Sequence, residues 1–452
     1  MSDSLLRFMQ QGELAPLSYY FSRFVARGCG ADENGILACS AALVSERSLN
    51  GDICVDLRNH ATRPFFDVEE GSVLESPRSP ALGDWRKSLL ESAWVGGPGE
   101  YSPLILDGHR LYLGKYWAFE DTVAKALLAR VDGARSLDAS LLARGLQRLF
   151  AATGEDPQAI DWQKIAAAIA VSKRFSVISG GPGTGKTTTV VKVLALLLEQ
   201  EPTLRIALCA PTGKAAARLT ESIRAGKGRV KVAEEMLQEI PAETHTIPRL
   251  LGAAPGGAFR YRAGNPLLID CLVVDEASMV DLPLMARLLQ ALPEQASVVL
   301  LGDRDQLASV EAGSVLGDVT GRGQEITYAA QQVAFLETLA AVGAGVLQAA
   351  DQPRRLAQGV ALLRTSYRFL AGSDIGELAD AVNRGAGQEA YDQIIDPTSA
   401  DLTWLEGGQD GVHVQALQWA VEHFKIYLKC SDVHEALHLF DGARVLTALR
   451  QG

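Results

Sequence analysis

The chain has 452 residues, and 47% of them are hydrophobic, which is enough for two or three domains that each bury a core. Its formal net charge of -11 argues against a protein that holds nucleic acid by bulk electrostatics, so any such contact must be local. The sequence has no apolar run of the roughly 18 residues that a membrane span needs, and its six cysteines are scattered rather than paired as in zinc or iron–sulfur sites. We therefore expect a cytoplasmic protein with reduced thiols that does not act at a membrane.

Residues 1–115 combine short helical patterns with one predicted hairpin, over residues 103–113, whose Asp107-Gly108 turn lies between alternating apolar residues. This pattern predicts a small α+β module. From residue 117 to about residue 150 apolar residues recur at helical spacing, and a linker rich in helix-breaking residues follows. We expect residues 116–155 to form a helical connector, with the first domain boundary near residue 155.

Beyond the connector, short apolar strands alternate with helices. A helix is predicted over residues 161–173, and a buried strand over 175–179 is followed by a glycine-rich loop and a second helix over 187–200. Further strands are predicted over residues 205–210, 271–274 and 297–301. This alternation is typical of an α/β fold with a doubly wound parallel sheet, which we assign to residues 156–370. Residues 321–360 are rich in alanine and glutamine and suit a mobile helical insertion more than a core element.

Residues 180–187 read Gly-Gly-Pro-Gly-Thr-Gly-Lys-Thr, which matches the phosphate-binding pattern G-x-x-x-x-G-K-[ST] between a predicted strand and a predicted helix. Glycines let backbone N–H groups turn toward phosphates, and the helix N-terminus adds a favourable dipole. Lys186 is expected to contact the β- and γ-phosphates of ATP, and Thr187 to offer its hydroxyl to Mg²⁺. The alternative, a glycine-rich turn without a ligand, is disfavoured by the flanking elements. The predicted ATP-binding residues of this loop are Gly180, Gly181, Pro182, Gly183, Thr184, Gly185, Lys186, Thr187 and Thr188.

Two carboxylates, Asp275 and Glu276, follow the predicted strand over residues 271–274. Ligands of open parallel sheets bind at the carboxyl ends of the strands. We expect Asp275 to hold Mg²⁺ and Glu276 to orient and deprotonate the water that attacks ATP. Such a pair is often only the charged start of a helix, an interpretation that loses weight after a phosphate loop.

A phosphate loop alone does not separate kinases, GTPases, transporters and helicases, so the later loops decide. Gln306 follows a third strand and is placed near the γ-phosphate, where its amide can report hydrolysis. Residues 210–218, Ala-Pro-Thr-Gly-Lys-Ala-Ala-Ala-Arg, offer a hydroxyl, glycine backbone and cations of the kind that contact a sugar-phosphate chain. Gln163 lies one helix before the phosphate loop, where its amide could read both the donor and the acceptor of adenine.

A basic stretch begins at this same loop. Residues 214–231 contain six Lys or Arg and one Glu, which favours a local nucleic-acid track in an otherwise acidic chain. A solvated basic helix face would give the same pattern, and the sequence leaves that alternative open.

Five segments resemble, in this order, the motifs of superfamily-one DNA helicases: the phosphate loop, APTGKAA, THTIPRLLG, VVDEASM and LGDRDQLASVEAGSVLGD. The residues of these segments are most similar to those of the RecD family of RecBCD subunits. The likeness covers roughly residues 155–320, and residues 363–369 resemble the next motif. It implies a RecA-like P-loop NTPase that moves 5′ to 3′ on single-stranded DNA, acts at duplex ends in double-strand-break repair, and assembles with RecB-like and RecC-like subunits. Residues 1–115 would contact the RecC-like partner.

The same resemblance implies roles for single residues. Arg368 would contact the γ-phosphate and stabilise charge in the transition state, with an ordinary surface arginine as the alternative. Pro211, Thr212 and Lys214 would contact the DNA backbone, and Thr244 and His245 would line the same path. A lone histidine is as often a structural residue, so His245 stays evenly balanced between the two interpretations.

Residues 371–452 are predicted to be helical and to lead, over residues 444–452, into the first strand of a second RecA-like lobe. A complete motor of this family has that lobe, on the order of 100 to 200 further residues, so we expect a form that binds ATP but hydrolyses it slowly. Two other functions are considered. One is a nucleotide-binding switch of the clamp-loader or kinase class, which the Gly-Asp-x-x-Gln and Ala-Pro-Thr-Gly-Lys loops disfavour. The other is an interaction subunit that binds ATP without turnover.

Overall fold

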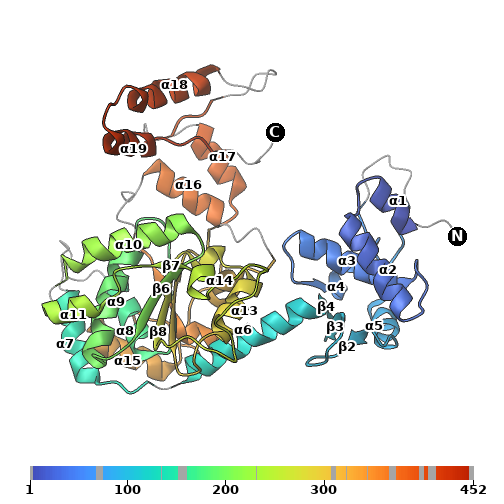
Figure 1. The fold of residues 1–452 in the computed structure, drawn as a ribbon, viewed down its shortest axis with the longest axis horizontal. Helices are drawn as coiled ribbons and strands as arrows, with labels where there is room; N and C mark the ends of the chain where they lie inside the picture. The colour runs from blue at the N-terminus through green and yellow to red at the C-terminus, as the bar shows by residue number, and fades with distance from the viewer. Residues whose placement is uncertain are drawn as a thin grey trace. The chain divides into compact units, whose positions relative to one another are not determined.

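The computed structural model (Figure 1) describes residues 4–67, 75–133, 135–150, 160–230, 232–306, 312–321, 323–343, 345–365, 373–395, 402–405 and 414–446. The chain divides into two compact units, residues 1–368 and residues 369–452. The first unit contains two hydrophobic cores, one formed by side chains between residues 5 and 111 and one by side chains between residues 123 and 363.

The first core joins helices to a small sheet. Its four strands lie in the order β1-β4-β3-β2, and the predicted hairpin is confirmed as the antiparallel pair β3 and β4. Gly108 has φ +60°, the left-handed conformation that a tight hairpin turn uses and that glycine adopts without a steric penalty. The buried indole of Trp85 donates its N–H to Ser40 Oγ at 2.8 Å, so its polar atom is satisfied inside the core. The elements are α1 (Ser4–Gln10), α2 (Pro16–Gly28), α3 (Ile36–Leu49), β1 (Cys54–Asp56), α4 (Leu57–His60), α5 (Leu82–Leu90), β2 (Val95–Gly96), β3 (Leu104–Asp107) and β4 (Arg110–Leu113).

The second core is built on a six-stranded parallel sheet in the order β10-β5-β9-β8-β6-β7. The strands are β5 (Phe175–Gly180), β6 (Ile206–Ala210), β7 (His245–Thr246), β8 (Cys271–Val274), β9 (Ser297–Gly302) and β10 (Val360–Leu363). Four of them match the predicted strands within about one residue, and the α/β fold with a parallel sheet is confirmed. The two edge strands, β7 and β10, were not predicted, because two to four residues carry too little pattern to stand out.

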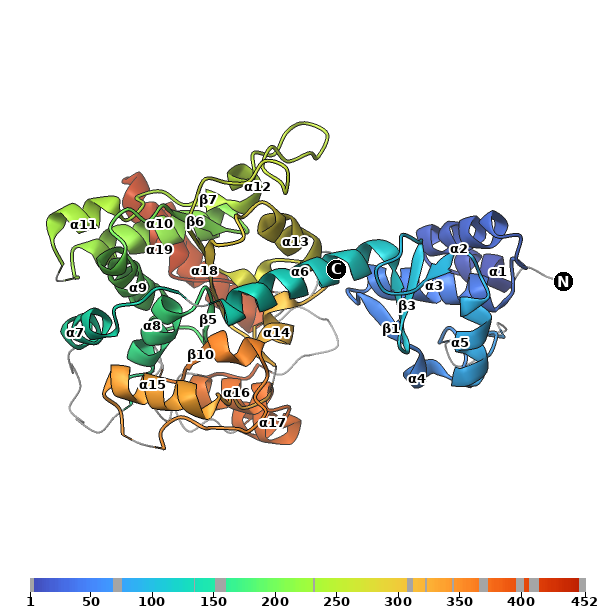
Figure 2. The ribbon, with the colours of Figure 1, turned by 90° about the horizontal axis from the view of Figure 1, so that it is seen from below.

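Helices cover both faces of this sheet, as an α/β fold requires for strands that are apolar throughout (Figures 1 and 2). One face carries α8 (Trp162–Ser172), α9 (Lys186–Gln200) and α10 (Gly213–Lys227), and the other carries α6 (Gly114–Asp132) and α13 (Leu282–Gln290). The helix predicted over residues 161–173 is confirmed as α8. It begins where Asp161 accepts the Lys164 N–H at 3.0 Å as an N-cap, and its alanines pack closely on α9 and β10. Shorter elements are α11 (Glu234–Glu239), α12 (Ile247–Leu250), η1 (Ala277–Met279), α14 (Val315–Thr320) and η2 (Leu356–Gly359).

The predicted boundary near residue 155 does not separate two cores. Helix α6 and helix α7 (Ala139–Leu149) place Leu127 and Leu146 in the same core as the parallel sheet. The buried guanidinium of Arg130 also donates to the carbonyls of Ala296 and Pro293, at 2.9 Å each. The two cores therefore divide between residues 111 and 123, and the connector belongs to the larger one. The helix-breaking residues of this linker lie outside the described residues, and they do not coincide with the division between the two cores.

Residues 321–360, expected to form a helical insertion rather than a core element, contain a helix that belongs to the core. This stretch contains α15 (Ala330–Ala340), which packs against α7 and α8 and buries Leu336 completely. Next to it, the Tyr328 hydroxyl donates to the Val360 carbonyl of β10 at 2.6 Å. Small side chains let α15 approach its neighbours closely, so a composition that looked featureless in sequence is that of a packed helix.

The second unit is helical in its described residues. It contains α16 (Asp374–Asn383) packed on α17 (Gly387–Ile395), and α18 (Val414–Leu428) packed on α19 (Val433–Asp441). The strand expected from residue 444 is not seen over residues 444–446, and residues 447–452 lie outside the described part. Among the helices described in either unit, none has both the length and the apolar character needed to cross a membrane.

Candidate nucleotide and DNA site

The order of the strands brings the predicted functional loops to one edge of the sheet. All six strands run parallel, so their carboxyl ends lie together. The phosphate loop follows β5, the carboxylates Asp275 and Glu276 follow β8, and the loop of Gln306 follows β9, which lies between the other two. The residues expected to contact DNA follow β6, which pairs with β8, or lie at the start of β7, which pairs with β6. Neither the neighbour order nor the central position of β9 could be read from the sequence.

The phosphate loop has the backbone that its glycines permit. Gly183 and Gly185 have φ values of +78° and +80°, in the left-handed region, and α9 begins at the next residue, Lys186. A Cβ atom at Gly180 would lie 2.7 Å from Thr184 Oγ1, whereas one at Gly181 would meet no atom within 4 Å. The loop is therefore closely packed at its start and open beyond it, where a phosphate can approach the backbone.

Two polar side chains donate hydrogen bonds to the backbone of this loop. Lys186 Nζ donates to the carbonyls of Gly180 and Gly181, at 2.5 and 3.0 Å, so the ammonium lies in the bend of the loop. Gln163 Nε2 donates to the Thr184 carbonyl at 3.0 Å. The predicted position of Gln163 beside the nucleotide loop is thus supported, but its amide nitrogen is engaged with the loop backbone. The pattern predicted the position of this amide and not its contact with Thr184.

The carboxyl group of Asp275, directly after β8, lies in a poorly solvated, charged setting. Removal from water, together with the charge of Glu276, raises the pKa of Asp275 to about 6, while the nearby Lys186 ammonium lowers it. The backbone N–H of Glu276 donates to Asp275 Oδ1 at 2.9 Å. Glu276 itself has φ +51° and ψ +41°, a left-handed conformation that is unusual for a residue with a side chain. Asp275 and Thr187 offer the oxygen donors that suit Mg²⁺, and the raised pKa shows a carboxylate for which a cation would be a favourable neighbour.

Sequence reasoning missed two residues at this edge. Burial raises the pKa of Asp303, directly after β9, and the charge of Lys186 opposes part of this rise, so Asp303 is a second carboxylate, after Asp275, in the field of that ammonium. Ser278, in η1, donates its hydroxyl to Gln306 Oε1 at 2.9 Å and so connects the loop after β8 to the loop after β9. A carboxylate inside the segment Gly-Asp-Arg-Asp-Gln was a visible signal for Asp303. Nothing in the sequence pointed to the contact of Ser278.

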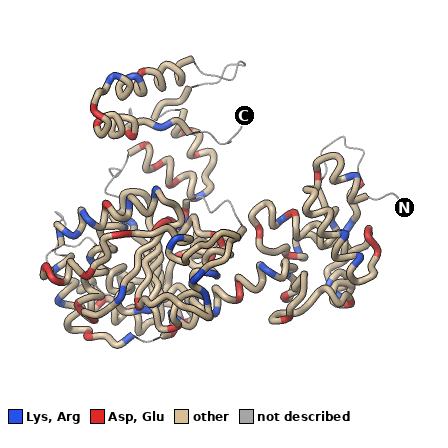
Figure 3. Tube along the Cα trace, in the orientation of Figure 1, with Lys and Arg blue, Asp and Glu red and all other residues tan. Residues whose placement is uncertain are grey.

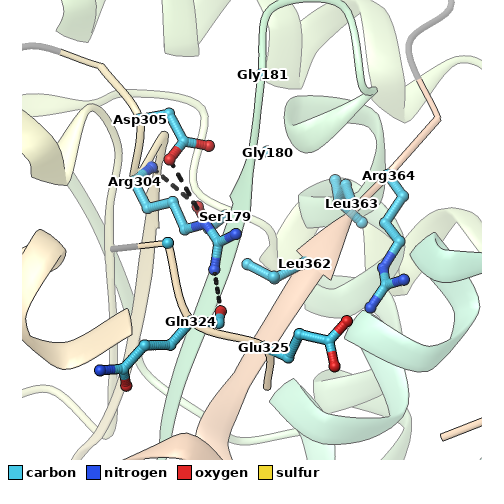
Figure 4. A pocket seen from close by; sticks show the side chains of 11 residues that line it. Ser179, Gly180, Gly181, Arg304, Asp305, Gln324, Glu325, Leu362, Leu363 and Arg364 are labelled. Atoms are coloured by element: carbon cyan, nitrogen blue, oxygen red, sulfur yellow. Dashed lines mark hydrogen bonds and ion pairs between the residues drawn. The ribbon is translucent and has the colours of Figure 1, made fainter. Parts of the chain in front are cut away.

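A cavity of about 330 Å³ lies beside the phosphate loop, between the ends of β5 and β10 (Figure 4). Its walls carry charges of both signs. The Arg304 backbone N–H donates to Ser179 Oγ at 3.0 Å, and its guanidinium donates to the Gln324 carbonyl at 2.9 Å. The Arg364 guanidinium stacks 4.4 Å from the centre of the Trp162 ring. Arg368, the expected γ-phosphate contact, lies outside the described residues, whereas Arg364 and Glu325 are charged residues that line this cavity.

The DNA half of the edge is more exposed. Thr212 Oγ1 accepts the Ala215 N–H at 3.2 Å and so caps α10, while Lys214 in the first turn is exposed. Lys and Arg residues follow along α10 (Figure 3), although Lys227 donates to the Ile240 carbonyl at 2.5 Å and is used within the fold. His245 pairs with Cys209 in the sheet, and the Thr244 N–H donates to Thr220 Oγ1 at 3.1 Å. The two segments expected to contact DNA, one with Pro211, Thr212 and Lys214 and the other with Thr244 and His245, are therefore neighbours at the end of the sheet.

The fold and this edge define the class of the protein as a P-loop NTPase. Residues 163–312 match the family described as AAA domain, and residues 10–112 match the RecBCD enzyme subunit RecD, N-terminal domain. The chain is 33% identical to the RecBCD enzyme subunit RecD of Haemophilus influenzae, over 98% of this chain and 74% of that protein. It is 37% identical to the RecD subunit of Mycolicibacterium smegmatis, over 93% of this chain and 67% of that protein.

More distant relatives match smaller parts. The ATP-dependent RecD2 DNA helicase of Deinococcus radiodurans is 46% identical over 31% of this chain and 17% of that protein. Among solved structures, the Pif1 helicase of Candida albicans aligns over 61% of this chain and 56% of its own with 17% identity and a TM-score of 0.28, too low to support a structural argument. The RecD subunits of Haemophilus influenzae and Mycolicibacterium smegmatis match most of this chain over two thirds or more of their own length. The chain therefore belongs to the family of RecD subunits of the RecBCD enzyme. The expectation of a helicase-type ATPase is thereby confirmed at the level of the family, and a kinase or clamp-loader switch is set aside.

Proposed function

We propose that this protein couples ATP hydrolysis to 5′-to-3′ movement on single-stranded DNA within a RecBCD-type complex that repairs double-strand breaks in the cytoplasm. The observation that carries the proposal is the strand order. The glycine-rich loop, two carboxylates and an amide follow β5, β8 and β9, and a hydroxyl and a lysine follow β6, which is the neighbour of β8, so all of them lie at one edge of a single sheet. A change of charge at the phosphate can then be passed to the DNA loops through adjacent strands.

In the proposed reaction, the phosphate loop binds the triphosphate through backbone N–H groups, and Lys186 exchanges the carbonyls of Gly180 and Gly181 for phosphate oxygens. Thr187 and Asp275 would hold Mg²⁺, which when bound neutralises charge on the phosphates. Glu276 takes the proton of the attacking water, and Gln306 donates its amide N–H to the γ-phosphate side of the site. Gln163 accepts from adenine through its oxygen, since its nitrogen is bound to Thr184.

The DNA contacts follow from the other half of the edge. Lys214 supplies a cation in the first turn of α10. The path of the single strand beside it would be lined by Pro211, Thr212, Thr244 and His245. Contacts of this kind hold the sugar-phosphate chain without reading its sequence. The α+β module of residues 1–115 would contact a RecC-like subunit, and RecB-like and RecC-like partners would present the duplex end. Arg368 keeps its proposed γ-phosphate role on resemblance alone.

Single-turnover ATP hydrolysis, measured with and without oligothymidylate, tests this function. A motor predicts hydrolysis that single-stranded DNA accelerates, with no preference among base sequences. A rate of ATP hydrolysis that does not change when oligothymidylate is added would contradict coupling between the two halves of the edge. Binding of ATP without turnover in either condition, and in the presence of the partner subunits, would instead support the interaction subunit that the sequence left open.

A further inference from the structure

Ser278 is the one hydroxyl recorded in contact with the amide of Gln306 in the part of the chain that the structure describes. Its Oγ donates to Gln306 Oε1 at 2.9 Å, and Ser278 itself is only 6% exposed, so the hydroxyl is held in place by the surrounding fold. Gln306 is exposed, and a surface glutamine ordinarily samples several rotamers. The contact therefore joins a fixed donor to a side chain that would otherwise be mobile.

The bond also decides which end of the amide faces the nucleotide. A carboxamide has an acceptor oxygen and a donor nitrogen, and a bond to one end orients the other. Because Ser278 occupies Oε1, the NH₂ group is the end that can point toward a phosphate oxygen. A donor is what an anionic γ-phosphate requires, and the reverse orientation would present an oxygen to it.

The backbone around this contact is arranged so that the two loops approach closely. A Cβ atom at Gly302, the last residue of β9, would lie 3.2 Å from the Ser278 backbone nitrogen and 2.5 Å from Leu316 Cδ2. Glycine at this position lets the end of β9 run against η1. Since Glu276 directly precedes η1, the base and the amide are linked through one short turn.

We propose that Ser278 is a positioning residue for ATP hydrolysis, orienting the amide of Gln306 and coupling it to the turn that carries Glu276. The inference rests on the proposed role of Gln306 at the γ-phosphate. Ser278 touches neither phosphate nor water in this scheme. It acts through Gln306, so its contribution should vanish when Gln306 is removed.

The test is a double-mutant cycle on ATP hydrolysis by the protein in its complex, with and without oligothymidylate. Ser278→Ala should lower kcat by about threefold to tenfold, the range of one lost hydrogen bond, with KM changed less than about twofold. Ser278→Thr keeps a hydroxyl and should retain most of the rate. In a Gln306→Ala background, adding Ser278→Ala should cause no further loss of rate. Ser172→Ala removes a hydroxyl that donates to the Ile169 carbonyl in the same lobe and serves as the matched control.

Losses that multiply in the double variant would overturn the inference, and so would an unchanged kcat in Ser278→Ala beside an impaired Gln306→Ala. A Gln306→Ala protein with full activity would overturn the proposed role of Gln306, and this inference with it. Should Ser278→Ala lower the melting temperature, the Thr variant and the affinity for ATP separate the two effects, since a merely unfolded fraction lowers apparent binding and rate together.

Discussion

The two halves of the sheet edge are built differently. After β5, β8 and β9, the functional side chains are tied to one another or to backbone, as Lys186 is to the phosphate loop and Gln306 to Ser278. After β6, Lys214 is exposed, and Thr212 uses its hydroxyl to cap a helix. Chemistry on one phosphate needs groups held in a defined geometry, whereas a polymer that slides needs contacts that can be exchanged. The half after β5, β8 and β9, whose side chains are fixed by these bonds, is called the rigid half below, and the half after β6 is called the exposed half; the difference between them fits what each would hold.

The largest effect is expected at the rigid half. Lys186→Ala should reduce ATP hydrolysis by roughly 10²-fold or more, because it removes the cation that meets the phosphates. It should hardly change the melting temperature, since the ammonium donates to carbonyls of an open loop and the substitution removes no side chain from the hydrophobic core. Rate and melting are measured together, with Lys125→Ala, an exposed lysine of α6, as the control. A variant that loses ATP binding only because it unfolds would remove Lys186 from this role.

Glu276→Gln should preserve binding of ATP and Mg²⁺ but slow hydrolysis by at least roughly 100-fold, the scale of a lost general base. The amide keeps the shape of the side chain, so binding is measured by nucleotide fluorescence and turnover by phosphate release. Glu235→Gln, an exposed position of α11, is the matched control. Unchanged turnover would show that another group takes the proton, and Asp303 would be examined first.

An acid-dependent loss of Mg²⁺-dependent ATP affinity is the next effect in size. The pKa of Asp275 is raised to about 6 without ligand, and only the carboxylate can bind a cation, so affinity should fall by up to about tenfold per pH unit below that value. Protonation of ATP itself affects every variant equally. The measurement is therefore the difference between the wild type and Asp275→Asn, which should lack this component.

Stability of the ligand-free protein should show the opposite sign. The folded-state pKa of Asp275 lies above its ordinary value of 3.8, so the stabilising contribution of the protonated form is complete below about pH 4 and is lost as the pH rises through about 6. Thermal melting of the wild type relative to Asp275→Asn checks this. If the wild type instead lost stability relative to Asp275→Asn as the pH fell through about 6, the result would contradict the burial of this carboxyl group.

The smallest effect is expected at the exposed half. Lys214→Ala should weaken binding of single-stranded DNA several-fold and lower the slope of log affinity against log salt by about 0.7, the loss of one phosphate contact. ATP affinity without DNA should not change. Lys125→Ala again serves as the control. An unchanged salt slope would favour the solvated basic face that the sequence also allowed for α10.

The sequence predicted the rigid half better than the exposed half, for a physical reason. Phosphate binding constrains residue type and spacing within one short loop, so the sequence motif alone identifies Lys186 and Thr187 as candidates. The carboxylates after β8 can be recognised in the sequence because two acidic residues directly follow an apolar strand. Contacts between loops leave no such mark: the bond of Ser278 to Gln306 and that of Gln163 to Thr184 join residues 28 and 21 positions apart. Their geometry depends on strand order, which only the folded sheet supplies.

Errors in the fold have a related origin. Alanine and glutamine in residues 321–360 carry little amphipathic pattern and so suggest an insertion, although Leu336 of α15 is fully buried. Helix-breaking residues after residue 150 suggest a domain boundary, although α6 and α7 share the core of the parallel sheet. Both mistakes concern packing partners distant in the chain, which local periodicity does not encode.

The left-handed backbone of Glu276 has a consequence for how this position would change over time. A side-chain-bearing residue in that conformation costs about 1 kcal/mol relative to glycine, which adopts it freely. Stability alone therefore favours glycine or asparagine at residue 276, and only turnover favours glutamate. In a lineage that kept the subunit for assembly but no longer needed its ATPase, this carboxylate should be among the first residues of the site to drift, and the direction of drift should be toward a more stable fold.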